Sequence, residues 1–583
     1  MKIKTLLSLM FISAMLFLTA CGPSIEEKKQ QFQTQTLTPL KEEGYRLIEK
    51  EEGKEKTRYL LRLEKGEKVA NFLLKSALGS SDPKLRQRLA RGLEGTGLEL
   101  QVDWQRYLKA KPGSVVAHLL PKAGMADTPV AQLLKARKMG GDLQFDEKGH
   151  LKKIVFHPLD ETLRQGSKTF HIQLQGTELV VARSGESTYD QAYTFRSEVF
   201  DLRREKKGER SGVKIRKFHC DADTRNAYFG KRNCSMGSLS TDFESVNDRT
   251  KVGIAVSTLS GRSETRPKDG EVLSHATVEI GDLSLQEDTP AEKGETKIRG
   301  IRFEGHASRI EEELYRRLAD LLTDPPASPK LTAKALMPLL ADLFQKLSLE
   351  YKVEVAGLDF SLTKNDSGKK SQLNLQGFRY GLDGEFAADL NLTKKLEISQ
   401  MKVVESGKGT LPREVEIAGF SVGVRLGGLY NFLPDAMQLA LKSTLAQDVA
   451  AKKALRKEGE ALGERMLQKG VRVTIDPLKV AKFFFKDSKM QKGFEAMNLH
   501  LDARLKPNQL DPRNPMAMML LIAYLEADGK ATMGKKDLEQ ILVELDPGMR
   551  MMVKQYVKYE GDRAVFDLHF EQGNLLINGK PLR

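Results

Sequence analysis

The chain has 583 residues, with 94 lysines and arginines against 79 aspartates and glutamates, for a formal net charge of +15. Its mean hydropathy of −0.42 excludes a polytopic membrane protein, and 48 glycines with 21 prolines exclude a collagen-like or wholly disordered chain. The length predicts about three to five domains, or one large repetitive unit. Because aromatic residues make up only 7% of the chain, with Trp104 as the single tryptophan, we expect an aliphatic core.

Residues 1–20 have the pattern of a bacterial lipoprotein signal peptide. Two lysines precede the uncharged, mainly apolar stretch 5–18, which is too short to cross a bilayer as a permanent helix. The tetrad Leu18–Cys21 follows and resembles a lipobox, whose small residues admit the signal peptidase and whose cysteine accepts a diacylglyceryl group. Several acyl chains, at about 0.8 kcal/mol per buried CH2, make an essentially permanent anchor. The alternative is an ordinary secretory signal that happens to end at Cys21.

Gly22 follows the modified cysteine, where an aspartate would favour retention in the inner membrane of a Gram-negative cell. By analogy with that sorting rule, we expect an anchor in the outer membrane and a protein that faces the periplasm. The residues after Cys21 are polar and nearly free of aromatic side chains, so segment 21–44 is predicted to be a flexible tether between lipid and fold.

Basic residues alternate with acidic ones along most of the chain, as in Arg203-Arg204-Glu205-Lys206-Lys207. Cleavage after residue 20 removes two lysines and leaves 92 basic against 79 acidic residues, or +13. Nucleic-acid-binding proteins concentrate such charge in a stripe with interleaved aromatic residues, or carry a known module, and the sequence has neither. We therefore expect no nucleic-acid partner, and a solvated surface with some attraction to anionic lipid.

Short alternating segments predict strands in an N-terminal α+β region, residues 45–205. Segment 141–158 is a hairpin candidate, because apolar residues alternate on both sides of a polar turn at 146–149. A second pair of strands is predicted around 175–176, and a helix around 69–78.

A weak internal repeat occupies the middle of the chain, residues 206–425. Four segments share an eight-residue form with apolar residues at positions 1, 3, 6 and 8: 213–220, 278–285, 353–360 and 396–403. After the last three, a polar loop leads to a second segment of similar shape: 297–303, 373–380 and 415–422. Alternation that slips once, often at glycine, predicts a bulged or bent strand whose two halves face one core. The alternative is chance similarity among amphipathic strands.

The C-terminal region, residues 426–583, combines helices and strands. A long helix is predicted from Pro434, a favoured first-turn residue, to Gly470, a favoured stop. The continuous apolar run 516–525 is too short to span a bilayer and predicts a buried helix. Together the patterns predict an α+β fold, in which repeated antiparallel β-hairpins form a curved sheet with amphipathic helices between them.

The end of the chain carries a family resemblance. Its closing run 573–582 (Gly-Asn-Leu-Leu-Ile-Asn-Gly-Lys-Pro-Leu) follows a helical segment with Val553-Lys554-Gln555-Tyr556-Val557. With the repeated strands, these features resemble the YdgA-like family of Gram-negative envelope proteins, a family of unknown function. The resemblance implies an envelope location and supplies no catalytic residues. Members typically keep an uncleaved N-terminal membrane helix, whereas this sequence has a lipobox.

Two motifs match enzyme signatures in spacing only. Segment 419–423 reads G-x-S-x-G, but a nucleophilic serine needs a strained turn between a strand and a helix, and Ser421 falls inside a repeated strand. Segment 529–535 approaches a phosphate-binding loop, yet Lys536 stands where Ser or Thr must bind magnesium, and no strand is predicted before it. We expect no enzymatic activity and no cofactor. A serine hydrolase using Ser421 is the less favoured alternative.

The sequence lacks the usual spacings of metal ligands. None of the nine histidines lies within four residues of another, and there is no C-x-x-C or H-E-x-x-H motif. Methionines at 516, 518, 519, 549, 551 and 552 offer thioether ligands for Cu(I), although methionine in an apolar run more often fills a core. We predict no metal site, with a Cu(I)-binding protein as an alternative.

Cys220 and Cys234 are predicted to form a structural disulfide. The periplasm is oxidising, Cys21 is used by the lipid, and thirteen polar, turn-like residues separate the remaining pair. A crosslink that closes a loop of about this size stabilises a fold by roughly 3 kcal/mol.

The expected function is that of a non-enzymatic, lipid-anchored periplasmic protein whose repeated sheet binds an envelope protein or an amphiphile. Two forms of the protein are possible, and they differ in whether the apolar side of the sheet over residues 213–424 is covered. If helices pack on it, the protein is a closed scaffold. If they do not, an open apolar groove remains that can carry lipid acyl chains.

Labelling of cells with palmitate tests the lipid anchor. The wild-type protein should incorporate the label, and Cys21→Ala should incorporate none because it lacks the acceptor thiol. Cys220→Ala keeps Cys21 and should label like the wild type. Equal labelling of Cys21→Ala and the wild type would contradict the lipobox.

Overall fold

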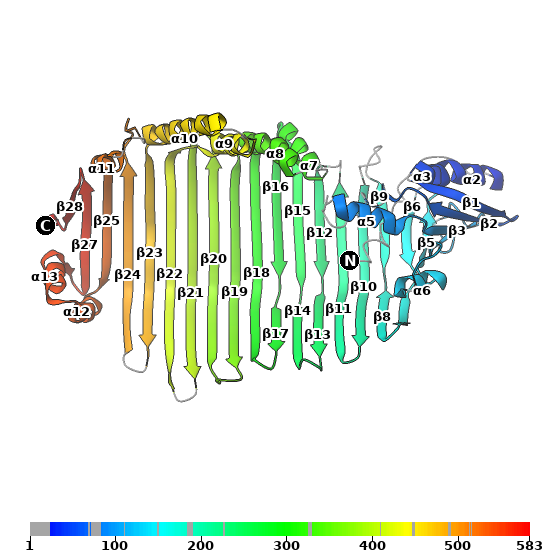
Figure 1. Cartoon of the computed structure of the whole chain (residues 1–583), viewed down its shortest axis with the longest axis horizontal. Coiled ribbons are helices and arrows are strands. Elements are labelled where there is room, and N and C mark those ends of the chain that lie inside the picture. The colour runs from blue at the N-terminus through cyan, green and yellow to red at the C-terminus, as the bar shows by residue number, and fades with distance from the viewer. Residues whose placement is uncertain are drawn as a thin grey trace. The chain divides into compact units, whose positions relative to one another are not determined.

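The computed structural model describes residues 24–42, 44–67, 70, 83–109, 111–126, 128–147, 151–183, 191–224, 228–323, 329–407, 410–445, 449–487, 491–511, 514 and 516–582. Strands account for 59% of the structure and helices for 23% (Figure 1), so the fold is largely antiparallel β, as the repeated hairpins predicted. Cys21, and the predicted helix at 69–78 apart from Ala70, lie outside the described residues. The chain divides into two compact units, Met1–Thr265 with Ala319–Ala327, and Arg266–Leu318 with Ser328–Arg583.

The first unit begins with short helical segments and continues as antiparallel strands. Its helices are α2 (Ile25–Phe32), a π-helical turn (Gln33–Leu37), α3 (Thr38–Glu42), α5 (Pro83–Leu93) and α6 (Pro129–Lys135). Its strands are β1 (Tyr45–Glu52), β2 (Lys56–Leu63), β3 (Gly97–Asp103), β4 (Val115–Leu120), β5 (Gly140–Phe145), β6 (Leu151–Phe156), β7 (Leu159–Gln165), β8 (Lys168–Gln175), β9 (Glu178–Arg183), β10 (Gln191–Lys206), β11 (Glu209–Thr224), β12 (Gly230–Met236), β13 (Ser238–Ser245), β14 (Thr250–Val256) and the start of β15 (Leu259–Lys268).

One of the two hairpins predicted in this unit is present. β5 and β6 pair as predicted, with Leu143 opposite Ile154. The strands on either side of residues 175–176 also form, but the prediction that they pair with each other is wrong. Both β8 and β9 pair with β10, because that strand has 16 residues and accommodates the two shorter strands end to end.

An aromatic cluster lies in the core of the first unit. Phe32, Trp104 and Tyr107 are fully buried and meet edge to face, with ring centroids 5.5 to 5.7 Å apart. Trp104 Nε1 donates a hydrogen bond of 2.8 Å to Thr57 Oγ1, so the one polar atom of the indole is satisfied. Most of the buried residues of this core are leucine, valine, isoleucine and alanine, as expected from the composition, and the aromatic cluster lies among them.

The expected flexible tether over residues 21–44 is wrong for its described part, 24–42. Ser24 and Glu27 form a reciprocal capping box that begins α2. Phe32, Leu37 and Leu40 are then buried in the same core as the aromatic cluster. The segment is polar in composition, but three of its apolar residues, Phe32, Leu37 and Leu40, lie on the side of the helices that contacts the core.

The second unit is a sheet built from long antiparallel hairpins (Figure 1). Its strands are β16 (Glu271–Ile280), β17 (Leu283–Asp288), β18 (Glu292–Glu311), β19 (Ser348–Lys364), β20 (Lys370–Phe386), β21 (Asp389–Gly407), β22 (Thr410–Tyr430), β23 (Val471–Lys486), β24 (Gln491–Leu505), β25 (Leu525–Gly534), β26 (Lys558–Glu560), β27 (Arg563–Glu571), β28 (Asn574–Ile577) and β29 (Lys580–Pro581). Its helices are α8 (Pro329–Leu343), α9 (Leu433–Leu445), α10 (Val449–Lys469), α11 (Ala517–Leu521), α12 (Lys535–Glu544) and α13 (Pro547–Tyr556), while α7 (Glu312–Thr323) spans the division between the units.

The predicted slip in the alternation is present as a backbone bend. Gly300, Gly377, Gly419 and Ala496 have positive φ angles, between 54° and 62°, and lie in the alternate strands β18, β20, β22 and β24. The regular ladder is interrupted at this level, for example between Val355–Phe378 and Gly357–Gln376. Each left-handed residue lets the alternation restart one position out of phase, so that apolar residues on both sides of it face the same way.

Two predictions for the helices of the second unit need correction. The single helix expected from Pro434 to Gly470 is instead α9 and α10, since Lys442 Nζ lies 2.6 Å from Glu458 Oε2 and residues 16 apart on one helix would be about 24 Å apart. The buried helix expected at 516–525 is a short helical segment between β24 and β25, and Met519 in it is 64% exposed. Five residues of α-helix are too few to pack a whole face against the sheet.

Because Gly377 has a left-handed conformation, we expect that adding a methyl group there lowers the stability of the second unit. Gly377→Ala should lower the free energy of unfolding of the second unit by about 2 kcal/mol, because an L-residue in this conformation costs roughly 1–2 kcal/mol and its Cβ would overlap Ser399 Oγ. Gly381→Ala, in the same strand but with no positive φ and no atom within 4 Å of the new Cβ, is the matched control. Urea unfolding followed by circular dichroism measures both, and equal midpoints for the two variants would contradict the bend.

Candidate functional site

The second unit carries a continuous apolar surface on one side of strands β18–β24. Just below the bend, one row of paired residues crosses all seven strands: Ile298, Leu358, Leu375, Met401, Ile417, Phe483 and Phe494. Just above it, a second row follows the same register: Ile301, Val355, Phe378, Ile398 and Phe420. We call these twelve residues, and the apolar residues that continue the alternation on their side, the apolar face.

The apolar face is not covered like a protein core. All twelve side chains of the two rows are partly exposed. The buried apolar side chains described in β18–β24 are Ile310, Phe386, Leu390, Leu429 and Val480. Helices α8, α9 and α10 lie along one end of the strands (Figure 1), where the ring of Phe344, just after α8, packs 5.3 Å from that of Phe386. The helices therefore close one end of the sheet and leave the apolar face open.

The apolar face extends over tens of ångströms both along and across the strands. From Leu349 to Leu362, β19 places apolar side chains on it over about 43 Å, at about 3.3 Å per residue. The seven strands span about 29 Å at about 4.8 Å per strand. Exposed apolar surfaces of this extent mark sites of binding.

Basic side chains gather at the hairpin tips, at the end of the strands away from the helices. Lys364 and Lys370 lie on either side of the β19–β20 tip, Arg413 follows the β21–β22 tip, and Lys486 precedes the β23–β24 tip. Among the described residues, these four have no ion-pair partner. Lys369, by contrast, lies 3.7 Å from Glu405. The apolar face thus ends at a rim of mixed charge, because Arg413 is directly opposite Glu405 and Lys486 is directly opposite Glu414.

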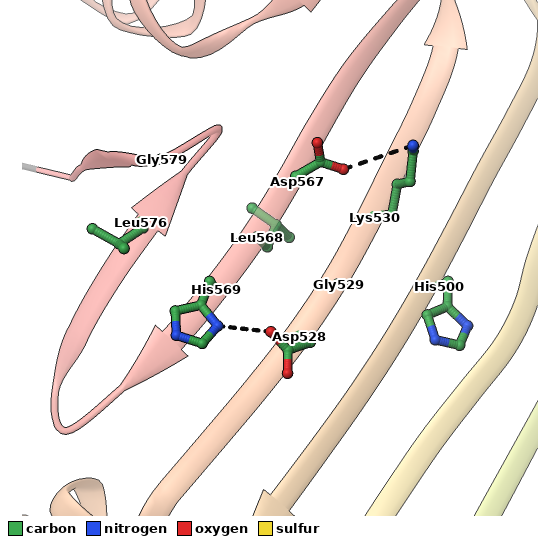
Figure 2. Close-up of a pocket in the computed structure, with 9 residues that line it drawn as sticks. All are labelled: His500, Asp528, Gly529, Lys530, Asp567, Leu568, His569, Leu576 and Gly579. Atoms are coloured by element: carbon green, nitrogen blue, oxygen red, sulfur yellow. Dashed lines mark hydrogen bonds and ion pairs between the residues drawn. The ribbon is translucent and has the colours of Figure 1, made fainter.

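The opposite side of the sheet is polar and has a pocket of about 400 Å³ near the C-terminus (Figure 2). His569 of β27 and Asp528 of β25 pair across the strands, with Nδ1 2.7 Å from Oδ1, and His500 comes from β24. The hydrogen bond to Asp528 raises the pKa of His569 above its ordinary value. No serine, threonine or cysteine lines the described pocket, so the histidine–aspartate pair lacks a nucleophile to activate.

The enzyme-like motifs do not form catalytic geometry. Ser421 lies inside β22, paired with Glu397 and Lys479, and the strand continues to Tyr430 without the turn that a nucleophilic serine requires. Segment 529–535 is the end of β25, which begins at Leu525, and the first residue of α12, so the expectation that no strand precedes the segment is wrong. Because its first glycine is inside the ladder opposite Leu501 and Leu568, the segment forms no loop around a phosphate.

The structure places the candidate metal ligands differently from the sequence expectation. Met516, Met519, Met549, Met551 and Met552 are all exposed rather than packed as core. The structure instead brings together two histidines that sequence spacing separates by 31 residues, His275 and His306, with ring centroids 4.1 Å apart. Only the register of two paired strands reveals this proximity, and a short-range search for motifs misses it.

The predicted disulfide is present in the structure. Cys220 in β11 and Cys234 in β12 lie directly opposite one another and are joined through their sulfur atoms. The segment between them is less loop-like than expected, because β11 runs on to Thr224 and β12 begins at Gly230. The bond therefore crosslinks two neighbouring strands of the first unit.

No family model and no curated protein matches this chain. The resemblance to the YdgA-like family stays a prediction. None of the described helices is long and apolar enough to cross a membrane.

The ion pair between His569 and Asp528 should produce a measurable change in the pKa of His569. Asp528→Asn should lower the pKa of His569 towards its ordinary value, which is about 6.5, because the hydrogen bond to Asp528 is the largest cause of the raised value. The pair stabilises the fold fully below that ordinary value, and this contribution is lost as the pH rises through the raised pKa. NMR titration of the imidazole measures the shift. Glu571→Gln, which removes a carboxylate 3.7 Å away, should have the smaller effect; an unchanged pKa in Asp528→Asn would refute the assignment.

Proposed function

We propose that this protein is a lipid-binding protein of the cell envelope, whose apolar face holds the acyl chains of lipids. The observation that carries the proposal is the open state of that face: twelve apolar side chains lie in two registered rows, all of them partly exposed, and helices α8, α9 and α10 lie along one end of the strands. An open sheet face of this kind is what an acyl-chain carrier requires and what a closed scaffold lacks.

Acyl chains fit the surface better than a protein partner does. The central rows are aliphatic and phenylalanine side chains without a hydrogen-bonding group, so the surface offers contact area and little polar specificity. The lysine and arginine side chains at the hairpin tips can pair with an anionic headgroup at the end of the chains. About ten methylene groups laid on the face would gain roughly 8 kcal/mol, at about 0.8 kcal/mol each, before the entropic cost of ordering the lipid.

The cellular location predicted from the sequence supports the same function. The lipobox at Cys21 would hold the protein in the outer membrane facing the periplasm, beside a supply of lipid. We propose that the protein is non-enzymatic and needs no cofactor, since neither Ser421 nor the His569–Asp528 pair has catalytic geometry. We also propose that the fold is of the α+β class. In it, the amphipathic helices between hairpins close one end of a curved sheet with an apolar side.

Lipid that copurifies with the protein tests the proposal. Wild-type protein extracted gently should carry phospholipid or lipopolysaccharide detectable by mass spectrometry. Leu375→Glu should reduce the bound lipid at least tenfold, because a carboxylate at the centre of the apolar face must be desolvated when a chain covers it, at a cost of several kcal/mol. Gln376→Glu is the matched control, since it adds the same charge to the adjacent exposed residue on the polar side.

Three results would count against lipid binding. Gently extracted wild-type protein that repeatedly lacks lipid contradicts it directly. Equal loss of lipid in Leu375→Glu and Gln376→Glu would show that charge anywhere on the sheet, rather than on the apolar face, is responsible. A stoichiometric protein copurifying in place of lipid would favour the scaffold alternative.

A further inference from the structure

Two histidines and a carboxylate meet on the polar side of the second unit, away from the apolar face. In the β16–β18 ladder, His275 lies directly opposite His306, and Thr277 lies directly opposite Glu304. Because alternate residues of a strand point to the same side, the four side chains share one patch. One nitrogen from each histidine and one carboxylate oxygen of Glu304 all lie within 4.8 Å of one another.

The atoms of this cluster are at distances that suit a shared cation. His275 Nδ1 lies 2.9 Å from His306 Nδ1 and 3.1 Å from His306 Nε2. His306 Nε2 lies 3.3 Å from Glu304 Oε1. Ligands held about 2.0–2.1 Å from a tetrahedral zinc ion are about 3.3 Å apart. The His275–His306 and His306–Glu304 distances are close to this spacing, and the His275 and Glu304 atoms lie within 4.8 Å of each other.

Neighbouring side chains hold two of the three ligands in place. Thr277 Oγ1 lies 3.1 Å from His275 Nε2, and a hydrogen bond from Nε2–H to this oxygen leaves the Nδ1 lone pair facing His306. Arg302 Nη2 donates to the Oε2 atom of Glu304 at 3.3 Å, which leaves Oε1 towards His306. Histidines that bind a metal ion typically have orienting contacts of this kind.

The positive charge near the cluster is mostly compensated. Lys352 of β19 is opposite Glu304, but its Nζ lies 2.6 Å from Glu350 Oε1. Glu350 is itself opposite His306, and Arg302 also lies 3.7 Å from Glu279. A divalent cation would therefore enter a patch that holds acidic groups from all three neighbouring strands.

We propose that His275, His306 and Glu304 form a binding site for a divalent first-row transition cation such as Zn²⁺. Two imidazoles and a carboxylate suit borderline cations of this class. Three protein ligands leave a fourth position for water at the surface of the sheet. The site is independent of lipid binding, because its ligands lie on the side of the sheet opposite the apolar face.

Calorimetric titration of the whole protein, without a histidine tag, with zinc chloride tests the site. The wild type should bind one zinc ion per chain. His275→Ala and His306→Ala should each weaken binding at least tenfold, and Thr277→Val, which removes a positioning group, by about tenfold to a hundredfold. His569→Ala is the matched control: it removes a histidine paired with a carboxylate elsewhere on the polar side and should bind zinc like the wild type.

NMR of the wild-type protein provides a second test, which does not require any variant to fold. Added zinc should shift the imidazole signals of His275 and His306 and leave that of His569 in place. The proposal is overturned if the wild type shows no saturable zinc binding, if both histidine variants bind like the wild type, or if zinc moves the signals of other histidines instead.

Discussion

The second unit depends on one backbone constraint, the left-handed residue that recurs at the same level in alternate strands. A strand alternates its side chains with a period of two, so without a bend the apolar residues before the slip in this repeat and those after it would face opposite sides of the sheet. Gly300, Gly377, Gly419 and Ala496 shift the alternation by one residue. Both halves of each strand then place apolar side chains on one surface and charged side chains on the opposite one.

The two units differ in how they cover their apolar strands. In the first, the helical segments at residues 25–42 bring Phe32 against Trp104 and Tyr107, and the strands beneath are buried. In the second, α8, α9 and α10 lie at one end of the strands, near Phe386, and leave the middle of the apolar face partly exposed. The same chain therefore contains a closed core and an open apolar surface, and the open surface is where we propose that lipid binds.

The sequence predicted the hairpins and the bend because both depend on local patterns. Period-two alternation, its slip near Gly377 and the polar tip around Asn365 are readable within a few residues. Features that depend on distant partners were missed. β8 and β9 fail to pair because β10 is long enough to take both, and Phe32 is buried although its own segment is polar. His275 and His306 become neighbours only through the β16–β18 register, which aligning Val278 with Phe303 would have revealed.

Photo-crosslinking in living cells tests the central claim most directly, namely that the apolar face is occupied by lipid acyl chains. A photoreactive amino acid is placed at residue 375, on the apolar face, and in a second protein at residue 376, on the polar side. The account predicts that labelled lipid crosslinks strongly at residue 375 and weakly at residue 376. Crosslinking of protein alone at residue 375, or equal crosslinking of lipid at both positions, would contradict it.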